Sequence, residues 1–229
     1  MKTMPLLAAF LLVVTSQTIT AQDTLGLSEA IAQGNPDEVR RSIEAGADVN
    51  QKFDLGILHD MTPLGQVCII TWLREPADTL EIIRLLIEAG ANANEKFEGM
   101  TVLGQAVQTG GVLLAIIEPL VAGGLDIDAK NISGKTALHG AALLGRTMWL
   151  EPLIENGADL NAKDDNGRTP LFLAVLKDKK EAAEILITKG ANVNAESSNG
   201  LTPLDIAVYN KDKDLADLIR DHGGISGNQ

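Results

Sequence analysis

The sequence predicts an all-α solenoid of stacked helix-turn-helix units that are joined by β-turn loops. Two short markers recur along the 229-residue chain, and their spacing becomes constant toward the C-terminus. Hydrophobic residues make up 45% of the chain, yet aromatic residues make up only 3%. Small aliphatic side chains in this excess suit thin, repetitive helical packing. Self-similarity at a fixed period is typical of repeat proteins, in which each unit packs on its neighbours.

The two markers keep step over five units. The first is a glycine with a polar tail, at residues 46–50 (GADVN), 90–94 (GANAN), 124–128 (GLDID), 157–161 (GADLN) and 190–194 (GANVN). The second is a threonine tripeptide, at residues 62–64 (TPL), 101–103 (TVL), 136–138 (TAL), 169–171 (TPL) and 202–204 (TPL). Because two independent markers share one period, chance is a poor explanation of the repeat.

One unit shows why each repeat should form two helices. Thr169 is predicted to cap the first helix, with Pro170 in the first turn, where its missing N–H costs nothing. The second helix is expected over Glu181–Lys189 and should end at Gly190 in the left-handed conformation. The apolar face of the first helix comprises Leu171, Ala174 and Val175. Neither helix could bury its apolar face alone, so the units must stack.

Other helix ends carry signals of their own. Asn35 followed by Pro36 should begin a helix, and Asp78, with a glutamate three residues later, has the spacing of a capping box. Pro119 and Pro152 fall where an outer helix should already be running. Since proline removes a helical hydrogen bond and clashes one turn back, we expect those two outer helices to start late or kink.

These repeats resemble the ankyrin repeat family. The resemblance is carried by TALHGAA (136–142), TPLFLA (169–174), TPLDIA (202–207) and the five glycine tails, and it covers about residues 25–224. It implies an ankyrin repeat domain over residues 22–229. The implied repeats span about 25–50, 59–94, 98–128, 133–161, 166–194 and 199–224. Extra residues fall in the second and third repeats, around Thr71–Asp78 and within residues 109–119.

The N-terminus is predicted to be a signal peptide over residues 1–21. Lys2 precedes an apolar run from Leu6 to Val14, and a small, polar stretch follows to Ala21. This order of regions is typical of a cleaved secretory signal, and the apolar run is too short for a stable membrane anchor. A buried N-terminal helix is the alternative. We therefore expect a periplasmic or secreted protein.

Charge and cysteine content restrict the classes of partner. The net charge of −12 repels nucleic acid and anionic membranes and favours a protein partner with a basic surface. We expect a monomer, no nucleic-acid binding and no membrane insertion after signal cleavage. The single cysteine, Cys68, precedes two isoleucines and is predicted to be a buried, inert thiol.

The loop ADLNAKDDNGRTPL, residues 158–171, holds many oxygen ligands but does not fit a calcium loop. Such a loop ending its turn at Gly167 would need an acid at position 162 and glutamate at 173, where the chain has Ala162 and Leu173. Equivalent loops keep the glycine and threonine while their acid content changes, which indicates turn geometry. SGKT, residues 133–136, lacks the first glycine of a phosphate-binding loop. We expect no metal and no cofactor.

Histidines give little support for catalysis. The resemblance implies that His139 braces neighbouring loops through hydrogen bonds. His59, with Asp54 and Asp60 nearby in sequence, motivates a weak enzymatic alternative. Asn131-Ile132-Ser133 is a glycosylation sequon. We expect no enzymatic activity.

The resemblance implies a concave partner-binding surface made of loop tips and the exposed face of each first helix. Trp149 is expected in the core, whereas Trp72 lies in the insertion and is a candidate hot spot. The candidate partner-binding residues are Met61, Ile69, Trp72, Phe97, Met100, Lys135, Leu143, Leu144, Asp165, Arg168, Leu176, Lys177, Leu201 and Tyr209. Exposed apolar residues in such a stripe commonly mark an interaction site.

The sequence thus predicts an exported, non-catalytic protein-binding module. The alternative is a periplasmic inhibitor or immunity protein that neutralises a secreted toxic enzyme.

Overall fold

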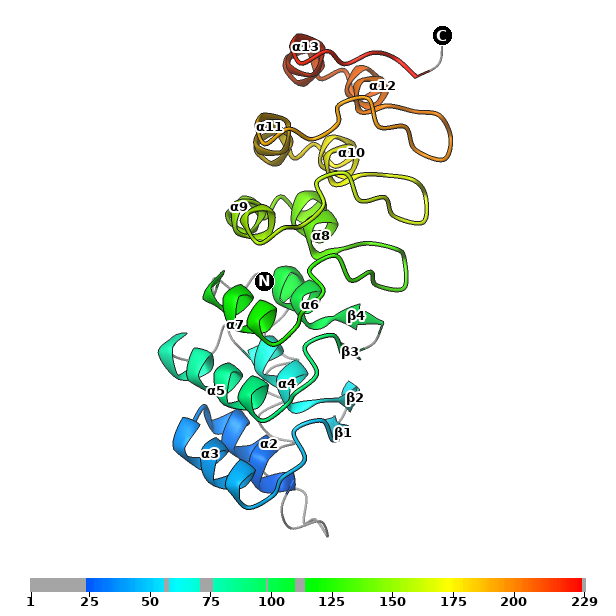
Figure 1. Cartoon of the computed structure of the whole chain (residues 1–229). Helices are drawn as coiled ribbons and strands as arrows, with labels where there is room; N and C mark the ends of the chain where they lie inside the picture. The colour runs from blue at the N-terminus through cyan, green and yellow to red at the C-terminus, as the bar shows by residue number, and fades with distance from the viewer. Residues whose placement is uncertain (1–23, 56–57, 71–75, 98, 110–113, 228–229) are drawn as a thin grey trace. The chain divides into compact units, whose positions relative to one another are not determined.

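The computed structural model describes residues 24–55, 58–70, 76–97, 99–109 and 114–227 (Figure 1). The predicted signal peptide and Trp72 lie outside these residues. The chain divides into two compact units, which are described separately. Unit 1 runs to Val102 and includes residues 111–125, and unit 2 comprises residues 103–110 and 126 onward.

Unit 1 is built from helix pairs and two short hairpins. Its helices are α2 (Thr24–Gln33), α3 (Pro36–Glu44), α4 (Pro63–Ile70), α5 (Pro76–Glu88), the 3₁₀ turn η2 (Leu114–Ile116) and α7 (Ile117–Ala122). Each pair packs within itself, and successive pairs pack through α2 on α4, α3 on α5 and α5 on α7. This nearest-neighbour pattern is what stacked repeats require.

The first two inter-repeat loops of unit 1 contain strands. β1 (Phe53–Leu55) pairs antiparallel with β2 (Leu58–Met61), and β3 (Lys96–Phe97) pairs with β4 (Met100–Thr101). The register places Phe53 opposite Met61 and Lys96 opposite Thr101. The helical body of the repeats therefore follows the all-α prediction, while these loops are hairpins.

Unit 2 forms two layers of helices. It contains α6 (Val102–Thr109) from its second residue, then α8 (Ala137–Leu144), α9 (Thr147–Glu155), α10 (Pro170–Leu176), α11 (Lys180–Thr188), α12 (Pro203–Tyr209) and α13 (Lys213–Asp221). The inner helices α8, α10 and α12 stack on one another, as do the outer helices α9, α11 and α13. In Figure 1 the inter-repeat loops of unit 2 project from the inner layer, away from α9, α11 and α13.

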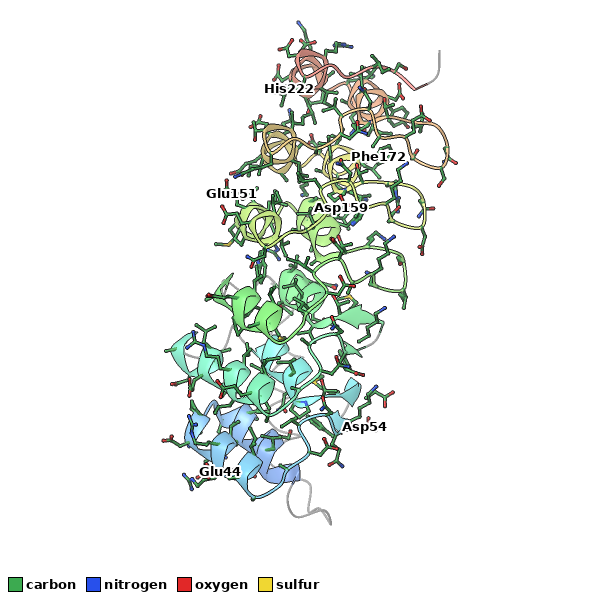
Figure 2. The ribbon with its side chains drawn as sticks, viewed as in Figure 1. Glu44, Asp54, Glu151, Asp159, Phe172 and His222 are labelled. Carbon is green, nitrogen blue, oxygen red and sulfur yellow. The ribbon has the colours of Figure 1, made fainter. Side chains whose placement is uncertain are left out.

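The core is aliphatic, as the composition predicts. Leu138 and Leu171 are fully buried, and alanines such as Ala141 and Ala174 let neighbouring inner helices approach closely. Trp149 on α9 is 1% exposed, which confirms the core position predicted for it. Figure 2 shows Phe172 on α10 within the stack and Glu151 on the far side of α9, in solvent.

The threonine marker caps the inner helices. Thr136, Thr169 and Thr202 each accept a hydrogen bond from the backbone N–H three residues on. Asn35 caps α3 in the same way, accepting from the backbone N–H of Glu38 at 3.2 Å. These predictions from sequence are confirmed.

Two helix-end predictions need correction. α5 already begins at Pro76, so Asp78 lies in its first turn and is not its N-cap. α9 begins at Thr147 and continues through Pro152, so of the two expected outcomes, a late start or a kink, the late start is wrong for this helix. α7 does begin only two residues before Pro119, after η2. α9 tolerates its proline because packing of Trp149, Leu150 and Leu153 outweighs one missing hydrogen bond.

Two further observations bear on the sequence predictions. Cys68 is fully buried, and burial raises the pKa of its thiol to about 12, as expected for an inert cysteine. Among the described helices, none is long and apolar enough to cross a membrane.

Candidate functional site

The polar tail after each marker glycine forms a turn through its own side chain. Asp48, Asn92, Asp126, Asp159 and Asn192 each accept a hydrogen bond from the backbone N–H two residues on, at 2.8–3.0 Å. Such Asx turns imitate a backbone turn with a side-chain oxygen. The first polar residue of each tail is therefore occupied within its own repeat.

The last residue of the tail reaches the next repeat. Asn50 donates from Nδ2 to the Gly90 carbonyl at 2.9 Å, and its Oδ1 accepts from the Asn92 N–H at 2.8 Å. In unit 2 the Asn161 Oδ1 accepts from the Asn192 N–H at 2.7 Å. Each repeat is thus joined to the next through backbone groups that would otherwise need water.

The same joint recurs at the C-terminus, where the sequence predictions missed it. Asn194 donates to the Gly223 carbonyl at 2.9 Å and accepts from the Ile225 N–H at 2.8 Å. Residues 223–227, GGISG, therefore take the place of a sixth polar tail. The signal in the sequence is that Gly223 follows Gly190 at the same interval at which Gly190 follows Gly157.

The acidic loop 158–171 uses its central carboxylate internally. The Asp164 Oδ1 accepts from the backbone N–H groups of Asn166 and Arg168 at 2.9 and 3.0 Å. Its Oδ2 accepts from Arg168 Nε and Nη2 at 3.0 and 2.8 Å. Burial alone would raise the pKa of this carboxyl, but the hydrogen bonds from Arg168 hold it below its usual value. Both oxygens of Asp164 thus serve the turn.

Neighbouring loops build the same turn with other side chains. Asn131 occupies the position of Asp164 in the preceding loop and accepts from the N–H groups of Ser133 and Lys135. Ser197 occupies it in the following loop and accepts from the Leu201 N–H. Among the residues that the structure describes, no group of three or more His, Cys, Asp or Glu is placed to hold a metal ion.

His139 links its own helix cap to the next loop. Its Nδ1 accepts from the Thr136 backbone N–H at 3.2 Å, so the proton lies on Nε2, which donates to the Arg168 carbonyl at 3.0 Å. Burial is the main cause of its lowered pKa. The bracing role that the resemblance implied for His139 is confirmed.

The neutral state of His139 predicts a pH dependence of stability. A histidine in the unfolded chain binds a proton below about pH 6.5, whereas His139 in the folded chain resists it. The free energy of unfolding should therefore fall as the pH drops from 7.5 to 5.5. Urea denaturation across this range would measure it, and His139→Gln should flatten the dependence. An unchanged slope in that variant would contradict the assignment.

The repeat register and the braced loops agree with comparison to known families. The sequence model of the family described as ankyrin repeats (3 copies) matches residues 76–164 and 141–229, more than half of the chain. The chain belongs to the ankyrin repeat family. Ankyrin repeats mediate protein–protein interaction and are typically non-catalytic. A search of curated proteins found no match to this ankyrin chain.

Nine of the candidate residues lie in unit 2 of the ankyrin domain, and we call them the inner stripe. They are Lys135, Leu143, Leu144, Asp165, Arg168, Leu176, Lys177, Leu201 and Tyr209. Several occupy equivalent positions in successive repeats, namely Lys135, Arg168 and Leu201 in the loops and Leu143, Leu176 and Tyr209 on the inner helices. Because α8, α10 and α12 stack in order, these positions follow one face of unit 2.

Exposure varies along the inner stripe. Tyr209, the last residue of α12, is 83% exposed, and Leu144, the last residue of α8, is 42% exposed. Leu143, Leu176 and Leu201 are half-buried, whereas Asp165 and Lys177 are exposed. The guanidinium of Arg168 is bound to Asp164 and its side chain is 24% exposed, so it is less free than the sequence suggests.

The candidates in unit 1 are less accessible. Met61 and Phe97 are buried, so the expectation that they face solvent is wrong. Each lies in a hairpin, where alternate residues point to opposite faces; Lys96 is exposed and Phe97 is buried. Met100 is half-buried. The side chain of Ile69 lies outside the described residues.

Other residues singled out in the sequence are occupied. The Asp54 Oδ1 accepts from the Asp60 backbone N–H at 3.1 Å, which uses an acid of the proposed His59 group; the His59 side chain lies outside the described residues. The Asn131 amide of the sequon holds its own loop through two accepted hydrogen bonds.

Lysines gather at the C-terminal end of unit 2, which the sequence predictions did not anticipate beyond Lys177. Lys180 is paired with Asp212, whose carboxylate lies 3.0 Å from the lysine Nζ. That carboxylate also caps α13, accepting from the Leu215 N–H at 3.2 Å. The signal was present in the sequence as two lysine-rich turns, 177–180 and 210–213, at the repeat spacing.

Proposed function

We propose that the chain is an exported, non-catalytic module that holds a protein partner on its inner stripe. The observation that carries the proposal is the row of accessible apolar ends on stacked helices, above all Tyr209 and Leu144. An exposed tyrosine offers a large contact area at small entropic cost, and such residues dominate binding energy at interfaces.

The braced loops support this proposal physically. Hydrogen bonds between loops, such as His139 to Arg168 and Asp165 N–H to the Ser133 carbonyl, fix the positions of the loop tips before a partner arrives. A preorganised surface loses little conformational entropy on binding, which increases affinity. The loops of unit 2 thus suit recognition of a folded surface.

The partner that we propose carries a basic surface, and the chain acts on it as a monomer. The net charge of −12 would attract such a partner over long range and speed association. Added salt should therefore slow association more than it changes dissociation. The N-terminal pattern of residues 1–21 supports cleavage of a signal peptide and a periplasmic or secreted location.

An inhibitor or immunity role is the second candidate. A module that places Tyr209 and the loop tips against an enzyme could close its active site without any chemistry of its own. This role requires that the captured partner be a secreted toxic enzyme. Assay of that enzyme with and without the chain separates inhibition from scaffolding.

The proposal is tested by affinity capture from periplasmic extract followed by mass spectrometry. The binding variant is Leu144→Ala/Tyr209→Ala, and the control is Met148→Ala, which removes a 49%-exposed apolar side chain from the outer helix α9. We expect the binding variant to lose the captured partner and the control to retain it. Equal capture by both variants would refute the inner stripe as the binding surface.

Export has its own test. Cells expressing the full chain should yield a periplasmic protein whose N-terminus begins after Ala21, as read by N-terminal sequencing. Deletion of residues 2–21 should leave the protein in the cytoplasm. An uncleaved protein in the cytoplasm of cells expressing the full chain would contradict export.

A further inference from the structure

A hollow of about 750 Å³ opens at the turns that join α10 to α11 and α12 to α13, within unit 2. Four lysines line it, namely Lys177, Lys180, Lys211 and Lys213, together with three aspartates, Leu176 and Asn210. The whole chain carries a charge of −12, yet this lining holds more cationic than anionic side chains. The local charge is therefore opposite in sign to that of the chain.

Three of the four ammonium groups are available to a ligand. Lys180 is held by Asp212 at 3.0 Å, and this pair neutralises itself. Lys177, Lys211 and Lys213 are exposed, and within the described part of the chain no ion pair involves them. Among the residues that line the hollow, the remaining carboxylates are those of Asp178 and Asp214.

The backbone at the hollow places charged side chains in a conformation that favours glycine. Asp178 and Lys211 have φ of 53° and 60°, whereas the equivalent residues in two other repeats are Gly34 and Gly145, with φ of 67° and 68°. A side chain in the left-handed region is strained, and lysine has no special tolerance for it. Glycine would fit this turn more easily, so replacing Lys211 with glycine can remove the charge without straining the turn.

The helix ends add to the attraction for an anion. α13 is capped by the Asp212 side chain, but the N-cap of the nine-residue α11, Lys179, makes no side-chain cap hydrogen bond. The first N–H groups of α11 are therefore left for solvent or a ligand, at the positive end of the helix dipole. Tyr209, 83% exposed, directly precedes Asn210 of the lining and adds an apolar surface.

We propose that this hollow binds an acidic segment of the partner protein. An aspartate or glutamate carboxylate of that segment lies among Lys177, Lys211 and Lys213, and an adjacent apolar side chain packs on Leu176 and Tyr209. The inference rests on the proposed protein-binding function and names the chemistry of one part of that interface.

The charge of the chain favours a short acidic segment over a polyanion. Nucleic acid or an anionic membrane would bring many charges against a surface of net −12. One or two carboxylates within a partner of otherwise basic surface gain the local attraction of the hollow and avoid that repulsion. A partner of mixed charge therefore fits both the whole chain and the hollow.

The test is an NMR titration of the ¹⁵N-labelled chain with two synthetic peptides. The probe is Ac-GLEELG-NH₂, and its uncharged analogue replaces both glutamates with glutamine. We expect shift changes at residues 176–180 and 209–214 with the acidic peptide. The glutamine peptide should bind at least about tenfold more weakly, the size of one charge-assisted hydrogen bond. Inorganic phosphate and phosphatidylglycerol vesicles are titrated in parallel.

Three variants locate the binding. Lys177→Ala/Lys213→Ala should weaken the acidic peptide about tenfold, whereas Arg84→Ala/Lys96→Ala, which removes the same charge from exposed residues of unit 1, should change affinity little. Lys211→Gly should also weaken binding of the acidic peptide. The melting temperature of this variant should equal or exceed that of the unmodified protein, because glycine adopts the left-handed backbone conformation without strain. This combination separates a binding role from a structural one.

Several results would overturn the inference. These are equal affinity for the two peptides, shifts confined to residues outside the hollow, or tighter binding of phosphate or vesicles than of the acidic peptide. The protein-binding proposal is judged separately by capture. A partner that depends on Tyr209 but not on Lys177 and Lys213 would leave that function standing and remove the acidic subsite.

Discussion

Replacing Trp149 with alanine is expected to lower the free energy of unfolding by about 3–5 kcal/mol, the usual cost of deleting a large core side chain. Trp149 is 1% exposed on α9, in a core otherwise made of leucine, isoleucine, valine and alanine. Surrounding small side chains on a repeat scaffold cannot collapse far enough to fill the cavity. Urea denaturation followed by circular dichroism would measure the loss.

Trp149→Phe provides the matched control. The indole Nε1 is buried and has no hydrogen-bond partner in the described structure, and such an orphaned donor is itself destabilising. Phenylalanine keeps most of the ring volume and removes that donor. We expect its cost to stay below about 1.5 kcal/mol. A phenylalanine variant as unstable as the alanine variant would show that Nε1 has a partner.

Asp164→Ala is expected to cost about 2–3 kcal/mol, because it leaves two backbone N–H groups and the Arg168 guanidinium without their acceptor. The neighbouring loop tip would loosen with it, since the Asp165 N–H donates to the Ser133 carbonyl of the preceding loop. Hydrogen exchange should show faster opening of residues 164–168, and thermal unfolding should give the lower stability.

The preceding loop suggests the matched control, Asp164→Asn. Asn131 holds the equivalent turn with an amide oxygen. Asp164→Asn should therefore keep the two backbone hydrogen bonds and lose only the ion pair with Arg168. We expect less than half the effect of alanine. The lowered pKa of Asp164 also means that its contribution is lost as the pH falls below about 4, and the asparagine variant should lack this acid dependence. Similar loss in both variants would contradict the assignment.

Local signals allowed much of the fold to be predicted. The threonine caps and the proline at the start of α10 and α12 act on the nearest turn of chain, so their effect is readable from sequence. The constant repeat period of the C-terminal repeats then places α8, α10 and α12 beside one another. Trp149 could be assigned to the core because its position in the repeat faces the stack.

The predictions from sequence failed where contacts between separate elements determine whether a side chain is exposed. The loop before Thr62 pairs β1 with β2 as a hairpin, and Met61 is buried there, which the repeat pattern in the sequence does not indicate. Arg168 could not be recognised as partly sequestered without knowing that Asp164 faces it at 2.8 Å. The lysine hollow depends on two turns that are distant in sequence and meet only when α10 and α12 stack.

The repeated joints make the chain modular at the level of its gene. Asn161 and Asn194 present the same side chain to the next repeat in the same geometry, as shown by the bonds to Asn192 and Ile225. An in-frame deletion or duplication of the codons from one of these asparagines to the next would therefore rebuild an intact joint. Recombination could change the length of the binding face in whole repeats without disturbing the repeats that remain.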